Sequence, residues 1–132
     1  MTDHTDSVYR QAMYSYQSKL PIYSLAFSTK KNNYLRLALG SLSNAVSESS
    51  SFPENRLEII ELRKDGSKLK RTAKIEQKIP PSKIMFFPEH TSANPDLFIT
   101  SSDTLKIWEI LENGEIEIKS SLLNVTLRCM VF

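Results

Sequence analysis

A single stretch decides the fold class of this chain: Leu97-Phe98-Ile99-Thr100-Ser101-Ser102-Asp103-Thr104-Leu105-Lys106-Ile107-Trp108-Glu109. It covers most of two short apolar runs, 96–101 and 104–110, which are separated only by Ser102 and Asp103. Short apolar runs bounded by turn residues are typical of β-strands, and this spacing predicts two antiparallel strands joined by a tight turn. Helix signals are nearly absent from the rest of the chain, so we expect an all-β protein.

The same order of strands occurs twice along the chain. Strands are predicted at 22–28, 35–40, 56–62 and 70–77, and again at 82–87, 96–101, 104–110 and 115–119. In each set a hairpin signal separates the third strand from the fourth, and Asp65-Gly66 is typical of a two-residue turn. The second hairpin signal is Asn113-Gly114. Asp65 and Asn113 are 48 residues apart, which is close to the about 40–45 residues of a four-stranded propeller repeat. A two-sheet sandwich explains the strands but not these matched hairpins, so we favour two repeated units.

An insertion lengthens the first unit. Ile22 and Ile84, which begin corresponding strands, are 62 residues apart, and the extra residues lie at 41–55. Serine fills six of the eleven positions 41–51. A serine-rich segment between two strands is typical of a flexible surface loop, which is the structure we predict there.

Composition excludes several classes of protein. The 132 residues carry a formal charge of +2, so no strong overall field recruits nucleic acid or an anionic membrane. One cysteine excludes a disulfide framework, and no apolar run approaches the roughly 20 residues of a membrane helix. We therefore expect an intracellular soluble chain with no membrane partner and no direct nucleic-acid partner.

Catalytic and metal-binding patterns are equally sparse. His4, His90 and Cys129 have no spacing that predicts a metal site, and no glycine-rich phosphate loop is present. Asp103 would need a second titratable partner for catalysis, and the nearest carboxylates already have loop or strand-end interpretations. We expect no cofactor, no metal, no small-molecule substrate and no enzymatic activity.

The stretch 97–109 resembles the end of a WD40 repeat, with Glu109 where the aspartate of Trp-Asp is usual. Further stretches resemble the first two blades of one WD40 family: Tyr34-Leu35-Arg36-Leu37-Ala38-Leu39-Gly40-Ser41, Pro80-Pro81-Ser82-Lys83-Ile84-Met85-Phe86, Pro95-Asp96-Leu97 and Ser101-Ser102-Asp103. That family comprises the plant transparent-testa-glabra, anthocyanin-regulating proteins and their animal relatives, the cullin-ligase-associated factors that hold tyrosine-regulated kinases. The resemblance covers about 14–123.

This resemblance implies an all-β WD40 β-propeller, present here as about two four-stranded blades of a seven-bladed ring. The first blade spans 18–78 and the second 79–123, while 124–132 begins a third blade or forms a divergent tail. Segment 1–17 contains a candidate ring-closing strand. Because a ring needs roughly 4–8 blades, we expect the N-terminal fragment of a longer scaffold, whose exposed edges make it poorly stable or self-associating when alone.

The resemblance also implies a function: a non-catalytic scaffold for protein–protein interactions, with kinases or transcription factors as partners, in cytoplasm and nucleus. Two alternatives stay open, a substrate receptor of a cullin-type ubiquitin ligase and a non-functional truncated product. Ser102 stands where the family usually has glycine before the turn aspartate. Leu111 stands two places after Glu109, where cullin-ligase adaptors often require arginine, so this blade lends no support to the receptor role.

Two groups of residues are candidates for a role in the complete protein. The blade motif consists of Asp103, expected to order its turn, Trp108, expected to pack between blades, and Glu109. The second group is a basic edge of six residues within twelve positions, opposed there only by Asp65: Arg63, Lys64, Lys68, Lys70, Arg71 and Lys74. This edge is either a solvated outer rim that discourages strand aggregation or a contact surface for a protein partner.

Overall fold

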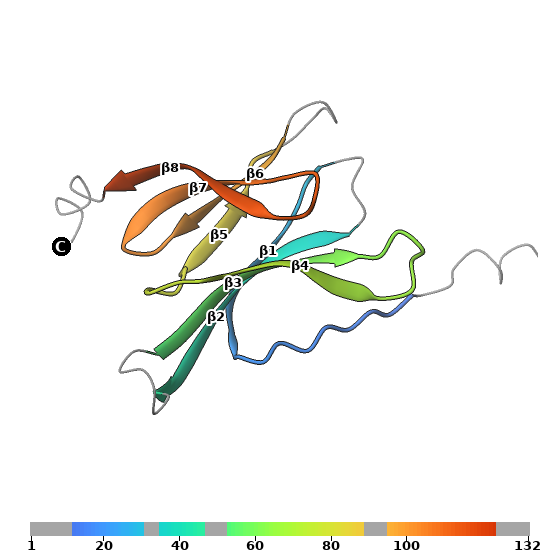
Figure 1. Ribbon diagram of the computed structural model, residues 1–132, viewed down its shortest axis with the longest axis horizontal. Coiled ribbons are helices and arrows are strands. Elements are labelled where there is room, and N and C mark those ends of the chain that lie inside the picture. Colours follow the sequence, from blue (N-terminus) through green and yellow to red (C-terminus); the bar gives the residue numbers. More distant parts are fainter. Residues whose placement is uncertain (1–11, 31–34, 47–52, 89–94, 124–132) are drawn as a thin grey trace, which may run out of the picture.

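The computed structural model describes residues 12–30, 35–46, 53–88 and 95–123, which form strands and no helix (Figure 1). The first sheet contains β1 (Ile22–Phe27), β2 (Arg36–Val46), β3 (Pro53–Leu62) and β4 (Leu69–Glu76). The second contains β5 (Lys83–Phe86), β6 (Asp96–Ser101), β7 (Thr104–Ile110) and β8 (Ile116–Leu123). Both are antiparallel, with strands in chain order. The predicted all-β fold of two four-stranded blades is confirmed, and no helix in these ranges could cross a membrane.

The predicted serine-rich loop is shorter than expected. β2 continues to Val46 and β3 begins at Pro53, so most of segment 41–55 belongs to paired strands, and 47–52 lies outside the described residues. Ser41 pairs with Arg56 in the ladder, and its buried hydroxyl donates to the Arg56 carbonyl at 3.4 Å. Backbone pairing therefore overrides the weak strand preference of serine, because a partner strand lies alongside.

Both predicted hairpins are present, but their loops are longer than two residues. The amide of Arg63 donates to the carbonyl of Lys68 at 2.9 Å, which closes a four-residue loop. A two-residue type I′ turn needs positive φ at both central residues. Only the glycine meets this condition, with φ of 71° at Gly66, because no described non-glycine residue has positive φ. At the other hairpin Gly114 (φ 89°) follows the same rule, in a three-residue loop closed by Leu111 and Glu115.

The hydrophobic core lies between the two sheets and is not divided into one core per sheet. Its buried residues come from both blades: Ala38, Leu57 and Ile59 from the first, and Ile84, Phe86, Phe98, Trp108 and Ile110 from the second. The innermost strands β1 and β5 also contact each other. Burial of apolar surface at about 25 cal/mol per Å² therefore stabilises the pairing of the blades as well as each blade.

The N-terminal segment is not a strand where the structure describes it. Residues 12–17 pair with no described strand and run alongside the first sheet (Figure 1). The Tyr16 hydroxyl donates to Oε2 of Glu58 in β3 at 2.6 Å, which ties the segment to that sheet. Residues 1–11 of this segment lie outside the described residues, and the ring-closing role stays a prediction.

Candidate protein-interaction surface

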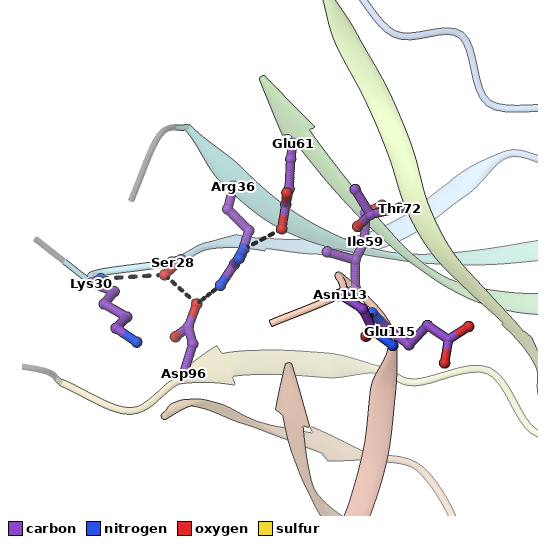
Figure 2. A network of polar contacts seen from close by, with 9 residues as sticks. All are labelled: Ser28, Lys30, Arg36, Ile59, Glu61, Thr72, Asp96, Asn113 and Glu115. Atoms are coloured by element: carbon purple, nitrogen blue, oxygen red, sulfur yellow. Dashed lines mark hydrogen bonds and ion pairs between the residues drawn. The ribbon is translucent and has the colours of Figure 1, made fainter. Parts of the chain in front are cut away.

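A polar network joins the two blades (Figure 2). Arg36, at the start of β2, donates through Nε to Glu61 in β3 at 2.6 Å and through Nη1 to Asp96 in β6 at 2.8 Å. Ser28, after β1, donates its hydroxyl to the same Asp96 oxygen at 2.7 Å. Asp96 is 2% exposed, so its charge depends on these partners and not on water. The network therefore fixes how the second blade is placed against the first.

Close backbone packing holds the inner strands of the two blades together. The Ser24 hydroxyl donates to the carbonyl of Pro81 at 2.7 Å, and that of Thr29 donates to the carbonyl of Phe87 at 2.9 Å. Gly40 lets the two blades approach closely because it has no side chain. A Cβ at this position would lie 2.6 Å from Cγ of Pro81. The small residue in β2 is thus required by the approach of the neighbouring blade.

Trp108 lies in the core between the blades, 1% exposed. Its ring stacks on Phe98 with centroids 6.2 Å apart, and its Nε1 donates to Oγ1 of Thr100 at 2.9 Å. The hydrogen bond matters because a buried indole N–H without an acceptor costs about 1–3 kcal/mol. This residue is a packing element of the frame and is not available to a partner.

Asp103 and Glu109 make side-chain contacts that are separate from those of Trp108 and from each other. Asp103 is exposed in the turn between β6 and β7, where a hydrogen bond from the Ser102 hydroxyl at 3.0 Å lowers the pKa of its carboxyl. Glu109 forms an ion pair with Lys119 of β8 at 2.7 Å, which raises the pKa of Lys119. The three motif residues therefore make separate structural contacts and form no common site.

The basic edge lies at the outer rim of the first blade. Its six side chains are all exposed: Arg63, Lys64 and Lys68 flank the hairpin turn, and Lys70, Arg71 and Lys74 belong to β4. β4 is the last strand of its sheet, and no strand in the described ranges pairs with its outer side. The structure thus gathers these residues along one free strand edge.

The carboxylates near the basic edge are already engaged. Glu61 is paired with Arg36, and Glu58 accepts from Tyr16 and lies 3.9 Å from Nη1 of Arg71. Asp65 accepts hydrogen bonds from the hydroxyl and amide of Ser67, at 2.6 and 2.9 Å, which lower the pKa of its carboxyl. The lysine side chains of this edge therefore keep their charge directed to solvent.

A shallow hollow lies beside the hairpin at one end of the basic edge. Its volume is ≈ 420 Å³, and its lining residues are Glu61, Leu62, Arg63, Lys64, Asp65 and Lys70. A second hollow of ≈ 350 Å³ separates the outer strands of the two blades, lined by Thr72, Ala73, Lys74, Ile75, Glu115 and Ile116. The first hollow thus meets β4 at Lys70, and the second lies between β4 and the start of β8.

The blades also expose apolar side chains on the faces that point away from their common core. Leu25 and Phe27 alternate along β1 with the core-facing Ala26, and both are about half exposed, at 50% and 55%. In β5 the 60% exposed Met85 lies between the buried Ile84 and Phe86. Large apolar side chains on both outer faces are suited to packing against further protein.

The described residues contain no group of three His, Cys, Asp or Glu side chains that could hold a metal ion. His4, His90 and Cys129 lie outside the described residues. The surfaces that the structure does present are a cationic strand edge and two apolar sheet faces, which are suited to binding other macromolecules by charge and by burial.

Sequence reasoning missed the residues that hold the frame together. Arg36 and Asp96 are 60 positions apart, and nothing local in either strand predicts their ion pair. The same holds for Tyr16 and Glu58, which are 42 positions apart. A charged residue within an apolar strand is a weak signal for a buried partner, but one sequence does not identify that partner.

Comparison with known proteins agrees with this architecture. No protein-family profile matches the chain. Among curated proteins, the chain is similar to the DDB1- and CUL4-associated factor 7 homolog of Dictyostelium discoideum, with 33% identity over 117 residues. These residues are 88% of this chain but 34% of the relative, so the chain spans about a third of the length of the curated relative it matches. The similarity supports a WD40 scaffold, whereas assignment to the transparent-testa-glabra proteins stays a prediction.

Proposed function

We propose that this chain contributes the first two blades of a non-catalytic WD40 scaffold that brings other proteins together. The observation that carries the proposal is the network of Arg36, Asp96, Glu61 and Ser28, which fixes two blades into one frame while leaving a strand edge and two sheet faces exposed. A rigid frame of this kind presents separate surfaces to separate partners. Two bound partners are then held close together, which raises their effective concentration for each other.

The family resemblance suggests which proteins are assembled. Protein kinases and transcription regulators are the proposed partners, with cytoplasm and nucleus as the proposed locations. We further propose that the chain is the N-terminal part of a complete propeller, which at about 43 residues per blade needs about 300 residues. An immunoblot of the endogenous protein with an antibody against 41–55 tests this. A band at 15.1 kDa would contradict it.

Tandem affinity purification tests the scaffold proposal. The endogenous full-length protein is purified through a tag on it and then through a tag on one recovered partner. We expect a second, different partner to remain bound after both steps. Replacement of Asp96 by alanine should lose this complex because it loosens the frame, whereas Glu109→Gln, which removes an ion pair within one blade, should keep it. Recovery of only one partner at a time would contradict a scaffold.

A second candidate is a substrate receptor of a cullin-type ubiquitin ligase. It is favoured by the relative, whose name associates it with DDB1 and CUL4. In this chain the position two places after Glu109 is Leu111, so the arginine often required by ligase adaptors is absent from this blade. Recovery of DDB1 in the same purification, in a stable and stoichiometric complex, would favour the receptor over a scaffold independent of the ligase.

A further inference from the structure

The positive charge of this protein is concentrated on one strand edge. Residues 63–74 contain six basic side chains and one aspartate, a formal charge of +5. The whole chain carries +2, so all other residues together carry −3. The edge is therefore a local positive field on an otherwise slightly acidic chain, and local fields of this kind select the charge of a partner.

The ladder distributes these charges over both faces of the sheet at its rim. Lys70 lies opposite Glu61, whereas Arg71 lies opposite Ile60 and Lys74 opposite Glu58, with a bulge between. Because side chains alternate between the faces of a strand, Lys70 points to one face and the other two residues to the opposite face. A partner lying on one face would meet only part of the charge, whereas a partner lying along the edge would meet all of it.

The backbone of β4 offers the same partner a second kind of contact. Gln77, just after β4, donates to the carbonyl of Asn55 at 2.9 Å, and Lys68, just before β4, accepts from Arg63. On each side of the bulge alternate residues of β4 bond to β3, and the remaining N–H and C=O groups face the outer side, where no described strand lies. An extended segment could bond to these groups as an added strand.

From these observations we infer that the outer edge of β4 binds an extended acidic segment of a partner protein, which adds to the first blade as a fifth strand. Carboxylates at neighbouring positions of that segment would point to opposite faces and meet Lys70 on one side and Arg71, which also lies 3.9 Å from Glu58, on the other. The inference rests on the proposed scaffold function and names the chemistry of one of its partners.

The site is best suited to the hairpin half of the edge. At the other end Glu115 of the second blade lines the hollow next to Lys74 and would repel a carboxylate. At the hairpin end the lining carboxylates are Glu61, paired with Arg36, and Asp65, engaged by Ser67. The acidic positions of the bound segment should therefore cluster opposite the Lys68–Arg71 part of the edge.

Peptide binding by the full chain tests the inference. The probe is a fluorescent peptide of about ten residues, the usual upper length of a strand, with glutamates at neighbouring positions and β-branched residues between. We expect it to bind at low salt, and a peptide with glutamine in place of every glutamate to bind about tenfold more weakly or worse. The same acidic peptide with alternate amides N-methylated should lose binding, because it cannot pair with a strand edge.

Matched variants locate the site. Lys64→Gln, Lys68→Gln and Lys70→Gln combined should weaken binding about tenfold, since three exposed charges at the hairpin end of the edge are removed. The control combines Lys19→Gln, Lys78→Gln and Lys83→Gln, three exposed lysines outside the edge, with the same loss of charge. It should change binding less than about twofold. Circular dichroism of both variants confirms that the sheets remain folded.

Several results would overturn the inference. Equal losses in the two triple variants would show that net charge, not this edge, attracts the peptide. Retained binding of the N-methylated peptide would exclude strand pairing. Equally tight binding of duplex DNA or of anionic lipid vesicles at the same lysines would show an unselective surface for polyanions. If the peptide does not bind and the edge variant associates with itself, the lysines only protect the edge from aggregation.

If tandem purification still recovers two partners in these cases, the scaffold proposal survives and the edge inference alone fails.

Discussion

Arg36 of the first blade and Asp96 of the second form an ion pair of 2.8 Å across the boundary between the blades. Asp96 is buried and Arg36 largely so, and Glu61 and Ser28 complete the network. Removal of one partner from such a buried pair leaves the other charge without compensation, which is strongly destabilising. The relation between the blades therefore depends on two residues that lie in different strands of different sheets.

Replacement of Asp96 by asparagine should reduce the free energy of unfolding by about 2–4 kcal/mol, because the Arg36 guanidinium loses a buried carboxylate. Urea denaturation followed by tryptophan fluorescence measures it, since Trp108 lies in the core between the blades. The control is Glu109→Gln, which removes the more exposed pair with Lys119 and should cost less than about 1 kcal/mol. Equal costs for the two variants would contradict the role given to Asp96.

Gly40→Ala should destabilise the chain by about 1–3 kcal/mol, because the added Cβ would lie 2.5 Å from Oγ of Ser24 and 2.6 Å from Cγ of Pro81. Gly66→Asn is the contrasting variant. At Gly66 no atom lies near the position of a Cβ, and asparagine tolerates the positive φ of 71°. It should cost less than about 1 kcal/mol. Thermal denaturation of both variants under one condition separates crowding from backbone conformation.

Thr100→Val should cost about 1–3 kcal/mol, because it leaves the buried Nε1 of Trp108 without its acceptor at 2.9 Å. In the background Trp108→Phe, which has no N–H to satisfy, the same change should cost much less. A double-mutant cycle measured by urea denaturation gives the coupling free energy directly. A coupling of zero would show that the hydrogen bond contributes nothing to the frame.

Tyr16 should make stability fall at alkaline pH. Burial and the hydrogen bond to Glu58 raise the pKa of its hydroxyl above the ordinary value of 10.0. The folded state therefore holds this proton more tightly than the unfolded state. The resulting stabilisation is complete below pH 10.0 and is lost as the pH rises through the higher pKa of the folded state.

Tyr16→Phe tests this expectation. Ultraviolet difference titration against the wild type should show one tyrosine that ionises at higher pH than a tyrosine in a short peptide. The variant should lose about 1 kcal/mol of stability at neutral pH, because buried Glu58 loses a donor. The free energy of unfolding of the variant should also fall less at alkaline pH than that of the wild type. Tyr23→Phe, at a half-exposed position of β1, is the control and should change neither measurement.

The sequence alone determined the elements of this fold. Strand periodicity predicted β6 and β7 at their observed bounds, and the Asp65-Gly66 and Asn113-Gly114 dipeptides predicted both hairpins. These features are local, because alternation of apolar side chains and the freedom of glycine at positive φ depend on neighbours in the chain. The basic edge was equally visible as a run of charge, although whether it binds a partner was not.

Tertiary structure decided how the elements are joined. The ion pair of Arg36 with Asp96 joins positions 60 residues apart, and the hydrogen bond of Tyr16 with Glu58 joins positions 42 apart. The extension of β2 to Val46 likewise depends on its partner strand, which the serine-rich sequence does not predict. The physical reason is the same in each case. A buried charge or a free backbone group can be satisfied by any complementary group, and only the folded chain determines which one lies within reach.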